Sequence, residues 1–70
     1  MRITHDKEAD AAYIYLKDIG EGEVAETIVL SDSVNIDVDA KGNTLGIELL
    51  FVSKRFPQSI PKNIAVENLS

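Results

Sequence analysis

The sequence predicts an α+β protein, an antiparallel β-meander of four to five strands followed by a short C-terminal helix. Apolar residues recur at every second position over long stretches, which is typical of strands that bury one face. The breaks between these stretches are short and polar, as expected between antiparallel neighbours. The alternation stops after residue 51, where a different element is expected to begin.

Five segments carry the strand pattern. The alternation is cleanest in the second, fourth and fifth segments, whereas the third is rich in β-branched residues and the first is short. In the turn at 39–43, Gly42 stands where a hairpin needs a positive φ. The strands are expected at 2–5, 11–17, 23–30, 33–39 and 44–51.

The positions of the apolar residues also predict the register, because a slip of one residue turns every side chain to the other face. In the hairpin at 33–51, Val38 is expected opposite Leu45, with Ile36 opposite Ile47 and Val34 opposite Leu49. The same reasoning pairs Ile3 with Ile14 and His5 with Ala12. The predicted core is Ile3, Ile14, Leu16, Ile28, Ile36, Val38, Leu45, Ile47, Leu49 and Phe51.

The C-terminal part is predicted to help cover one face of the sheet, since a lone sheet needs a second layer. Ser53 is expected to cap a short helix that ends before Pro57. Residues 1–56 are therefore expected to form one domain, and 57–70 a tail that is either a helix or an arm.

Composition and charge exclude several classes of function. The net charge is −5, so the chain repels phosphate and is not expected to bind nucleic acid. There is no cysteine for a disulfide or a thiolate metal site, and no apolar run long enough for a signal peptide or membrane span. A cytoplasmic protein without a cofactor is expected. Because 70 residues bury only a small core, a partner chain is expected to supply the missing stability.

One stretch imitates an EF-hand calcium loop. Asp37, Asp39, Gly42 and Glu48 have the spacing of such a loop, but Lys41 occupies a ligand position. The flanking segments are predicted strands, whereas an EF-hand requires helices. We therefore interpret the stretch as a hairpin turn with solvated acids.

The turn at 6–10 is a weaker candidate for a metal site. Asp6, Glu8 and Asp10 lie next to His5, and three carboxylates with an imidazole are able to hold a divalent cation. Acids in a tight turn also bond backbone amides as Asx turns, which is the interpretation we favour. His5 lacks a partner in the sequence that would make it a general base, so no catalytic residue is assigned.

Two tyrosines, Tyr13 and Tyr15, share one face of the second strand, opposite its apolar side. Such a pair is typical of a protein interface or of surface packing. The candidate interface residues are Tyr13, Tyr15, Phe56, Ile64 and Leu69.

Residues 1–56 resemble a family of small bacterial and archaeal proteins, the domain of unknown function 2283 family, also called YuzE-like. The resemblance is carried by DKEADAAYI at 6–14, IDVDAKGNTLGIELL at 36–50 and the Ser53 that follows. Members more often carry an aromatic residue where this chain has His5. The resemblance implies a compact β-meander with a helical end and no established activity.

Three functions remain open. The first is a non-catalytic module that associates with itself or with another protein, and a homodimer is expected because strand 23–30 has no lysine or proline to discourage edge pairing. The second is the antidote component of a toxin–antitoxin-like pair, whose acidic surface meets a basic partner. The third is a cation-binding enzyme or sensor that uses the acidic turns.

Overall fold

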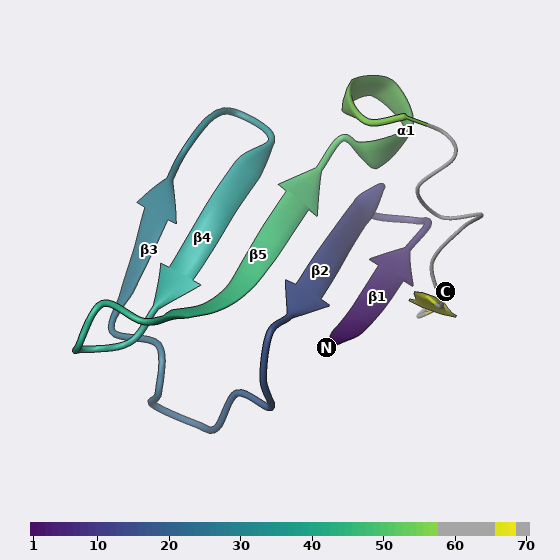
Figure 1. Ribbon diagram of the computed structural model, residues 1–70. Coiled ribbons are helices and arrows are strands. Elements are labelled where there is room, and N and C mark those ends of the chain that lie inside the picture. The colour runs from purple at the N-terminus through teal and green to yellow at the C-terminus, as the bar shows by residue number, and fades with distance from the viewer. Residues whose placement is uncertain (58–65, 69–70) are drawn as a thin grey trace.

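The alternating segments form strands in the computed structural model, which describes residues 1–57 and 66–68. Figure 1 shows the strands side by side in a single sheet, with one short helix at the end of the fifth. The protein is mostly β, and its helix has four residues. The elements are β1 Arg2–Asp6, β2 Ala11–Tyr15, β3 Glu26–Val29, β4 Val34–Val38, β5 Thr44–Leu50, α1 Val52–Arg55 and β6 Val66–Asn68.

The strand order is β3-β4-β5-β2-β1-β6, so the sheet is a meander only in part. β1 and β2 form one hairpin, and β3, β4 and β5 form a three-stranded meander. The two units join where β5 pairs antiparallel with β2. A simple meander would have placed β3 there. Instead β5, the longest and one of the most apolar strands, occupies the centre, where both of its edges are hydrogen-bonded.

A row of isoleucines crosses the five antiparallel strands, one residue from each. The register places Ile28 opposite Ile36, Ile36 opposite Ile47, and Ile47 opposite Ile14. The predicted pair of Ile14 with Ile3 completes the row. The predicted pairs Ile36–Ile47 and Val34–Leu49 are confirmed, as is the pair His5–Ala12. One face of the sheet is therefore apolar from β3 to β1.

The prediction that Val38 faces Leu45 is wrong. A β-bulge between Asp37 and Val38 shifts the register so that Val38 lies opposite Thr44. The bulge leaves Leu45 unpaired with β4, and its carbonyl instead accepts the amide of Leu16 at 3.0 Å. Leu45 is the most buried apolar side chain within residues 1–57, at 2 % exposure, so the bulge places the extra residue in the core.

The buried core is smaller than the predicted one. Within residues 1–57, the buried apolar side chains are Ile3, Val38, Leu45 and Val52, and Val52 was not predicted. Other predicted members are half-buried: Ile14, Ile36, Ile47 and Leu49. Three more are exposed, contrary to prediction: Leu16, Ile28 and Phe51. Leu16 follows the end of β2, Ile28 lies on the outer strand, and Phe51 takes a left-handed conformation that turns it away from the β5 alternation.

The start of α1 also differs from prediction. Phe51 is the N-cap, with φ of 54°, and Ser53 lies inside the helix rather than capping it. The helix does end before Pro57, because Phe56 is extended. The helix is far too short to cross a membrane, and no other helix in the described ranges could do so.

Beyond Pro57, the structure describes residues 66–68, which form β6 and pair parallel with β1. This part of the tail returns to its own sheet as a strand, whereas a helix or an arm was expected. The candidate interface residues Ile64 and Leu69 lie outside the described residues.

Candidate functional site

The face opposite the isoleucine row carries a hydrogen-bonded network centred on Asp37. The hydroxyl of Tyr13 on β2 donates to Asp37 Oδ2 on β4 at 2.5 Å. Thr27 on β3 donates its hydroxyl to the other carboxylate oxygen at 2.5 Å. Beside this group, Asn35 donates to Glu48 at 2.8 Å across the β4–β5 ladder. These bonds tie four strands together on the polar face.

Gly46 makes the central bond of this network geometrically feasible. Tyr13 must reach across β5 to contact Asp37, and Gly46 lies opposite Asp37 on β5. A Cβ at position 46 would lie 2.3 Å from the Tyr13 hydroxyl oxygen and 2.4 Å from a ring carbon. The ring of Tyr13 thus fills the space that a side chain at position 46 would occupy. Burial raises the pKa of the Tyr13 hydroxyl well above its ordinary value, and the hydrogen bond to Asp37 raises it further.

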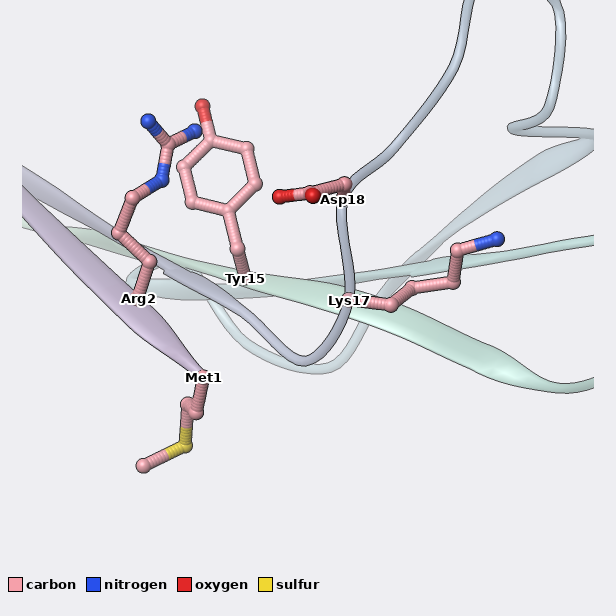
Figure 2. A pocket seen from close by; sticks show the side chains of 5 residues that line it. All are labelled: Met1, Arg2, Tyr15, Lys17 and Asp18. Atoms are coloured by element: carbon pink, nitrogen blue, oxygen red, sulfur yellow. The ribbon is translucent and has the colours of Figure 1, made fainter.

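Tyr15 lies next to Tyr13, with ring centroids 4.6 Å apart. The guanidinium of Arg2 lies 4.2 Å from the centre of the Tyr15 ring, a cation–π contact. These two side chains line a pocket of about 290 Å³ together with Met1, Lys17 and Asp18 (Figure 2). Lys17 points away from Arg2 in this view and pairs with Glu23. Both cations are thus engaged within the chain, and the pocket offers no convergent set of charges to a ligand.

A second cluster joins the β1–β2 turn to α1. Asp10 has φ of 53° and Phe51 φ of 54°, and these are the two described residues other than glycine with positive φ. Between them, the Val52 amide donates to the Asp10 carbonyl at 3.0 Å. Ser53 donates its amide to Asp10 Oδ1 at 3.0 Å and its hydroxyl to Oδ2 at 2.8 Å. The carboxylate of Asp10 therefore caps the helix from a residue far away in sequence.

This cap also explains the state of the Asp10 carboxylate. The hydroxyl of Ser53 and then its amide lower the pKa of Asp10 below the ordinary value. A negative charge at the start of a helix is favourable, because the first backbone amides have no hydrogen-bond partner within the helix and carry partial positive charge. The carboxylate and the carbonyl of Asp10 thus stabilise both residues with positive φ, Asp10 and Phe51.

The other acidic turns use their carboxylates differently, in hydrogen bonds to residues close by in the sequence. Asp6 Oδ1 accepts the amides of Glu8 and Ala9 at 3.1 and 3.2 Å, as an Asx turn does. Within residues 1–57 and 66–68, no group of three or more histidines or acids gathers as metal ligands would. The three acids predicted as a weak metal site, Asp6, Glu8 and Asp10, do not form such a group.

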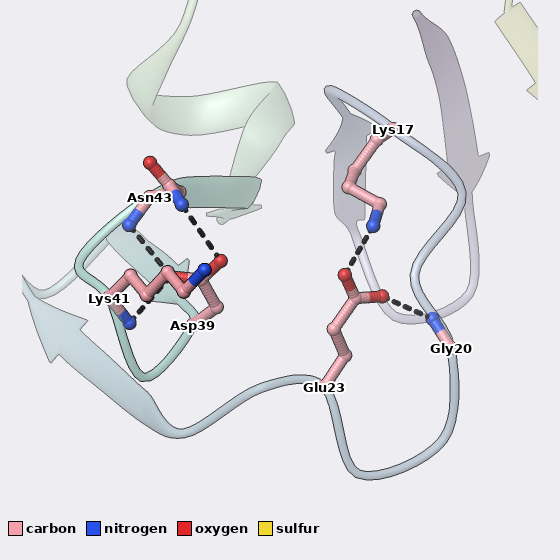
Figure 3. Close-up of polar contacts among 6 residues, drawn as sticks. All are labelled: Lys17, Gly20, Glu23, Asp39, Lys41 and Asn43. Atoms are coloured by element: carbon pink, nitrogen blue, oxygen red, sulfur yellow. Dashed lines mark hydrogen bonds and ion pairs between the residues drawn. The ribbon is translucent and has the colours of Figure 1, made fainter.

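The stretch that imitates an EF-hand is the β4–β5 hairpin, as the sequence predicted. Asp39 accepts the amides of Lys41 and Asn43 at 3.0 and 2.8 Å, and Gly42 has φ of 87° (Figure 3). Hydrogen bonds from Asn43 lower the pKa of Asp39. Figure 3 also shows Glu23 bridging Lys17 and the Gly20 amide in the β2–β3 link.

The outer strand β3 carries apolar side chains that nothing in the described residues covers. All four residues of β3 are exposed. Val29 is 72 % exposed and the adjacent Leu30 is 66 % exposed, while Ile28 and Val24 are 43 % and 38 % exposed. Exposed apolar residues on and beside the outer strand of a sheet are typical of surfaces that pair with another chain. We call residues 24–30 the β3 edge.

The predicted interface residues occupy different places. Tyr13 bonds Asp37 within the chain, and Tyr15 is held between Tyr13 and Arg2. Phe56 is half-buried just after α1. The candidate interface residues predicted from the sequence did not include Val29 and Leu30, although the sequence contained a signal for them. Segment 23–30 was the least regular in its alternation, as expected of a strand with one neighbour.

A family model described as protein of unknown function (DUF2283) matches residues 2–53, more than two thirds of the chain. No curated protein and no solved structure matches the chain. Two of the three features that carry the resemblance, the DKEADAAYI segment and Ser53, meet in the cap formed by Asp10.

Proposed function

We propose that this chain, which belongs to the DUF2283 family of proteins of unknown function, is a non-catalytic module that associates with a second copy of itself. The observation that carries the proposal is the β3 edge, where Val29 and Leu30 expose 72 % and 66 % of their surface. Burying such side chains stabilises a complex by about 1.5–3 kcal/mol each when burial is complete.

The small core supports the same proposal. In the range 1–57, the core holds four buried apolar side chains. A core of this size rarely supplies more than about 3–5 kcal/mol of stability on its own, so a second copy that covers further apolar surface would add to it.

The polar groups support a non-catalytic role. The carboxylates of Asp6, Asp10, Asp37 and Asp39 all accept hydrogen bonds from groups of the same chain, so each serves its own fold. The hydroxyl proton of Tyr13 is donated to Asp37 in a hydrogen bond within the sheet. The arrangement stabilises the sheet rather than presenting a reactive group.

The test is the mass of the protein in solution. Size exclusion coupled to light scattering is expected to give the mass of two chains, and the midpoint of thermal unfolding is expected to rise over about a hundredfold increase in concentration, because association stabilises the folded state by mass action. A mass of one chain, 7.7 kDa, at every concentration would overturn the proposal.

A further inference from the structure

We infer that two copies join edge to edge through antiparallel pairing of their β3 strands, with Ile28 facing Ile28 of the partner subunit on a two-fold axis. The inference rests on the proposed self-association and specifies its surface and register. The occupant of the β3 edge is thus a second copy of this chain.

The backbone of β3 determines which groups are free to pair. In an antiparallel ladder, alternate residues direct both their amide and their carbonyl to the same neighbour. Leu30 donates its amide to the Val34 carbonyl at 3.0 Å, and the register pairs Ile28 with Ile36. Leu30 and Ile28 therefore direct their backbone groups at β4. Thr27 and Val29, which alternate with them, direct theirs outward from the sheet.

The ends of the strand limit the outward groups to these two residues. The amide of Ala25 turns inward to the Val38 carbonyl at 2.9 Å, and the amide of Ser31 turns inward to the Val34 carbonyl at 3.2 Å. Neither amide is available to a neighbouring chain. Thr27 and Val29 are thus the two residues of the β3 edge that offer both an amide and a carbonyl to a neighbouring strand.

A single two-fold register uses all of these groups. Pairing Thr27 with Val29 of the partner subunit, and the reverse, forms four hydrogen bonds and places Ile28 on the axis. Centring the axis on Thr27 instead would require the amide of Ala25, and centring it on Val29 would require that of Ser31. The latter register would also set Glu26 opposite Asp32 of the partner subunit, a repulsive pair of like charges.

The same register extends the apolar face without a break. The isoleucine row is buried at its β1 end, where Ile3 is 7 % exposed, and open at its β3 end, where Ile28 is 43 % exposed. Placing Ile28 against its symmetry mate covers the open end and joins two rows of five into one. A second copy fits this edge because it presents the same row at the same height.

The two ends of the sheet also differ in protection. The β1 end is occupied by β6, a strand of three residues, and short edge strands discourage further pairing. The β3 edge has neither lysine nor proline between residues 24 and 30, and Glu26 is its one charged residue. Strands that stay exposed at a sheet edge usually carry lysine, proline or several charges that prevent pairing, and the β3 edge lacks these features.

Single cysteines test the register directly, because the natural chain contains none. Residues facing each other as a non-hydrogen-bonded pair have Cα atoms about 4.5 Å apart, within the range of a disulfide. Ile28→Cys is therefore expected to form a disulfide-linked dimer under mild oxidation. Thr27→Cys and Val29→Cys lie on diagonals about 7–8 Å long and are expected to remain mostly unlinked alone, but to cross-link when mixed.

The outcomes separate this inference from the proposed function. A two-chain mass with no cross-link at Ile28→Cys, or with preferential cross-linking at Thr27→Cys or Val29→Cys, would overturn the register while leaving self-association in place. A one-chain mass would overturn both.

A proline gives a second measurement that does not depend on oxidation. Because the Val29 amide points outward, Val29→Pro removes two hydrogen bonds from the symmetric dimer, one from each chain, and none from the monomer. It is expected to yield a folded single chain with an unchanged β circular dichroism spectrum, while Val29→Thr keeps the amide and remains dimeric. A Val29→Pro protein that is still dimeric would refute the inference.

Discussion

The contact between Gly46 and Tyr13 makes a strong prediction about a very small substitution. In Gly46→Ala, the new methyl group would lie 2.3–2.6 Å from three atoms of Tyr13, including two ring carbons. Ordinary carbon contacts are about 3.5–4.0 Å, so the whole ring must move by about 1 Å. The movement carries the hydroxyl away from Asp37, to which it now donates at 2.5 Å.

The magnitude follows from two costs. Overpacking costs about 1–3 kcal/mol, and weakening a hydrogen bond to a charged acceptor adds up to about 1.5–3 kcal/mol. Alanine is favoured over glycine in a strand by about 0.5–1 kcal/mol, which offsets part of this. We expect Gly46→Ala to lower the free energy of unfolding by about 2–4 kcal/mol. For a chain of this size, each kcal/mol lowers the unfolding midpoint by about 4–8 °C.

The assay is thermal and urea unfolding followed by far-ultraviolet circular dichroism, since the chain has no tryptophan. A second comparison introduces Gly46→Ala into a Tyr13→Val variant, in which no tyrosine ring lies over position 46. There the substitution is expected to stabilise by about 0.5–1 kcal/mol, so its sign reverses. Gly20→Ala is the matched control, because its new Cβ would meet Glu23 at an ordinary 3.6 Å.

Two results would refute this reasoning. One is a Gly46→Ala protein as stable as the natural chain, and the other is an equal loss of stability in the Tyr13→Val background. The second would mean that the methyl group conflicts with something other than the tyrosine ring.

Two further predictions concern pH. Because the pKa of Tyr13 is raised, its contribution to folding stability is fully present below about pH 10 and is lost as the pH rises further. In a Tyr15→Phe variant, Tyr13 is the one tyrosine left, and ultraviolet absorbance should show it ionising together with unfolding. Ionisation of Tyr13 while the sheet persists would contradict this prediction. The pKa of Asp10 is lowered, mainly by the Ser53 hydroxyl, so its contribution is present above the ordinary value of 3.8 and is lost as the pH falls below it. Asp10→Asn keeps a residue that tolerates positive φ, so it should be less stable than the natural chain at pH 7, with a difference in stability that shrinks toward pH 2. Adding Ser53→Ala to Asp10→Asn should lower the stability little further, and a difference in stability that did not depend on pH would be inconsistent with the cap.

The candidate site was only partly visible in the sequence. The exposed β3 edge had a sequence counterpart, since segment 23–30 was singled out for lacking lysine and proline. The Tyr13–Asp37 bond had none, because the two residues belong to strands separated by β5. The cap of Asp10 on α1 joins residues 43 positions apart, so local capping rules pointed instead to Ser53.

By itself the sequence determined where the five antiparallel strands lie, which face most of their apolar side chains occupy, and most of the register of the β1–β2 and β4–β5 hairpins. These follow from the alternation of apolar residues, since a one-residue slip would expose the whole row that contains Ile36 and Ile47. The tertiary structure alone decided that β5 pairs with β2, that a bulge buries Leu45, and that β3 remains at the edge. The physical reason is that alternation specifies the face of the sheet on which a side chain lies, but not which strand lies beside it. The order of the strands depends on packing between residues that are far apart in the sequence.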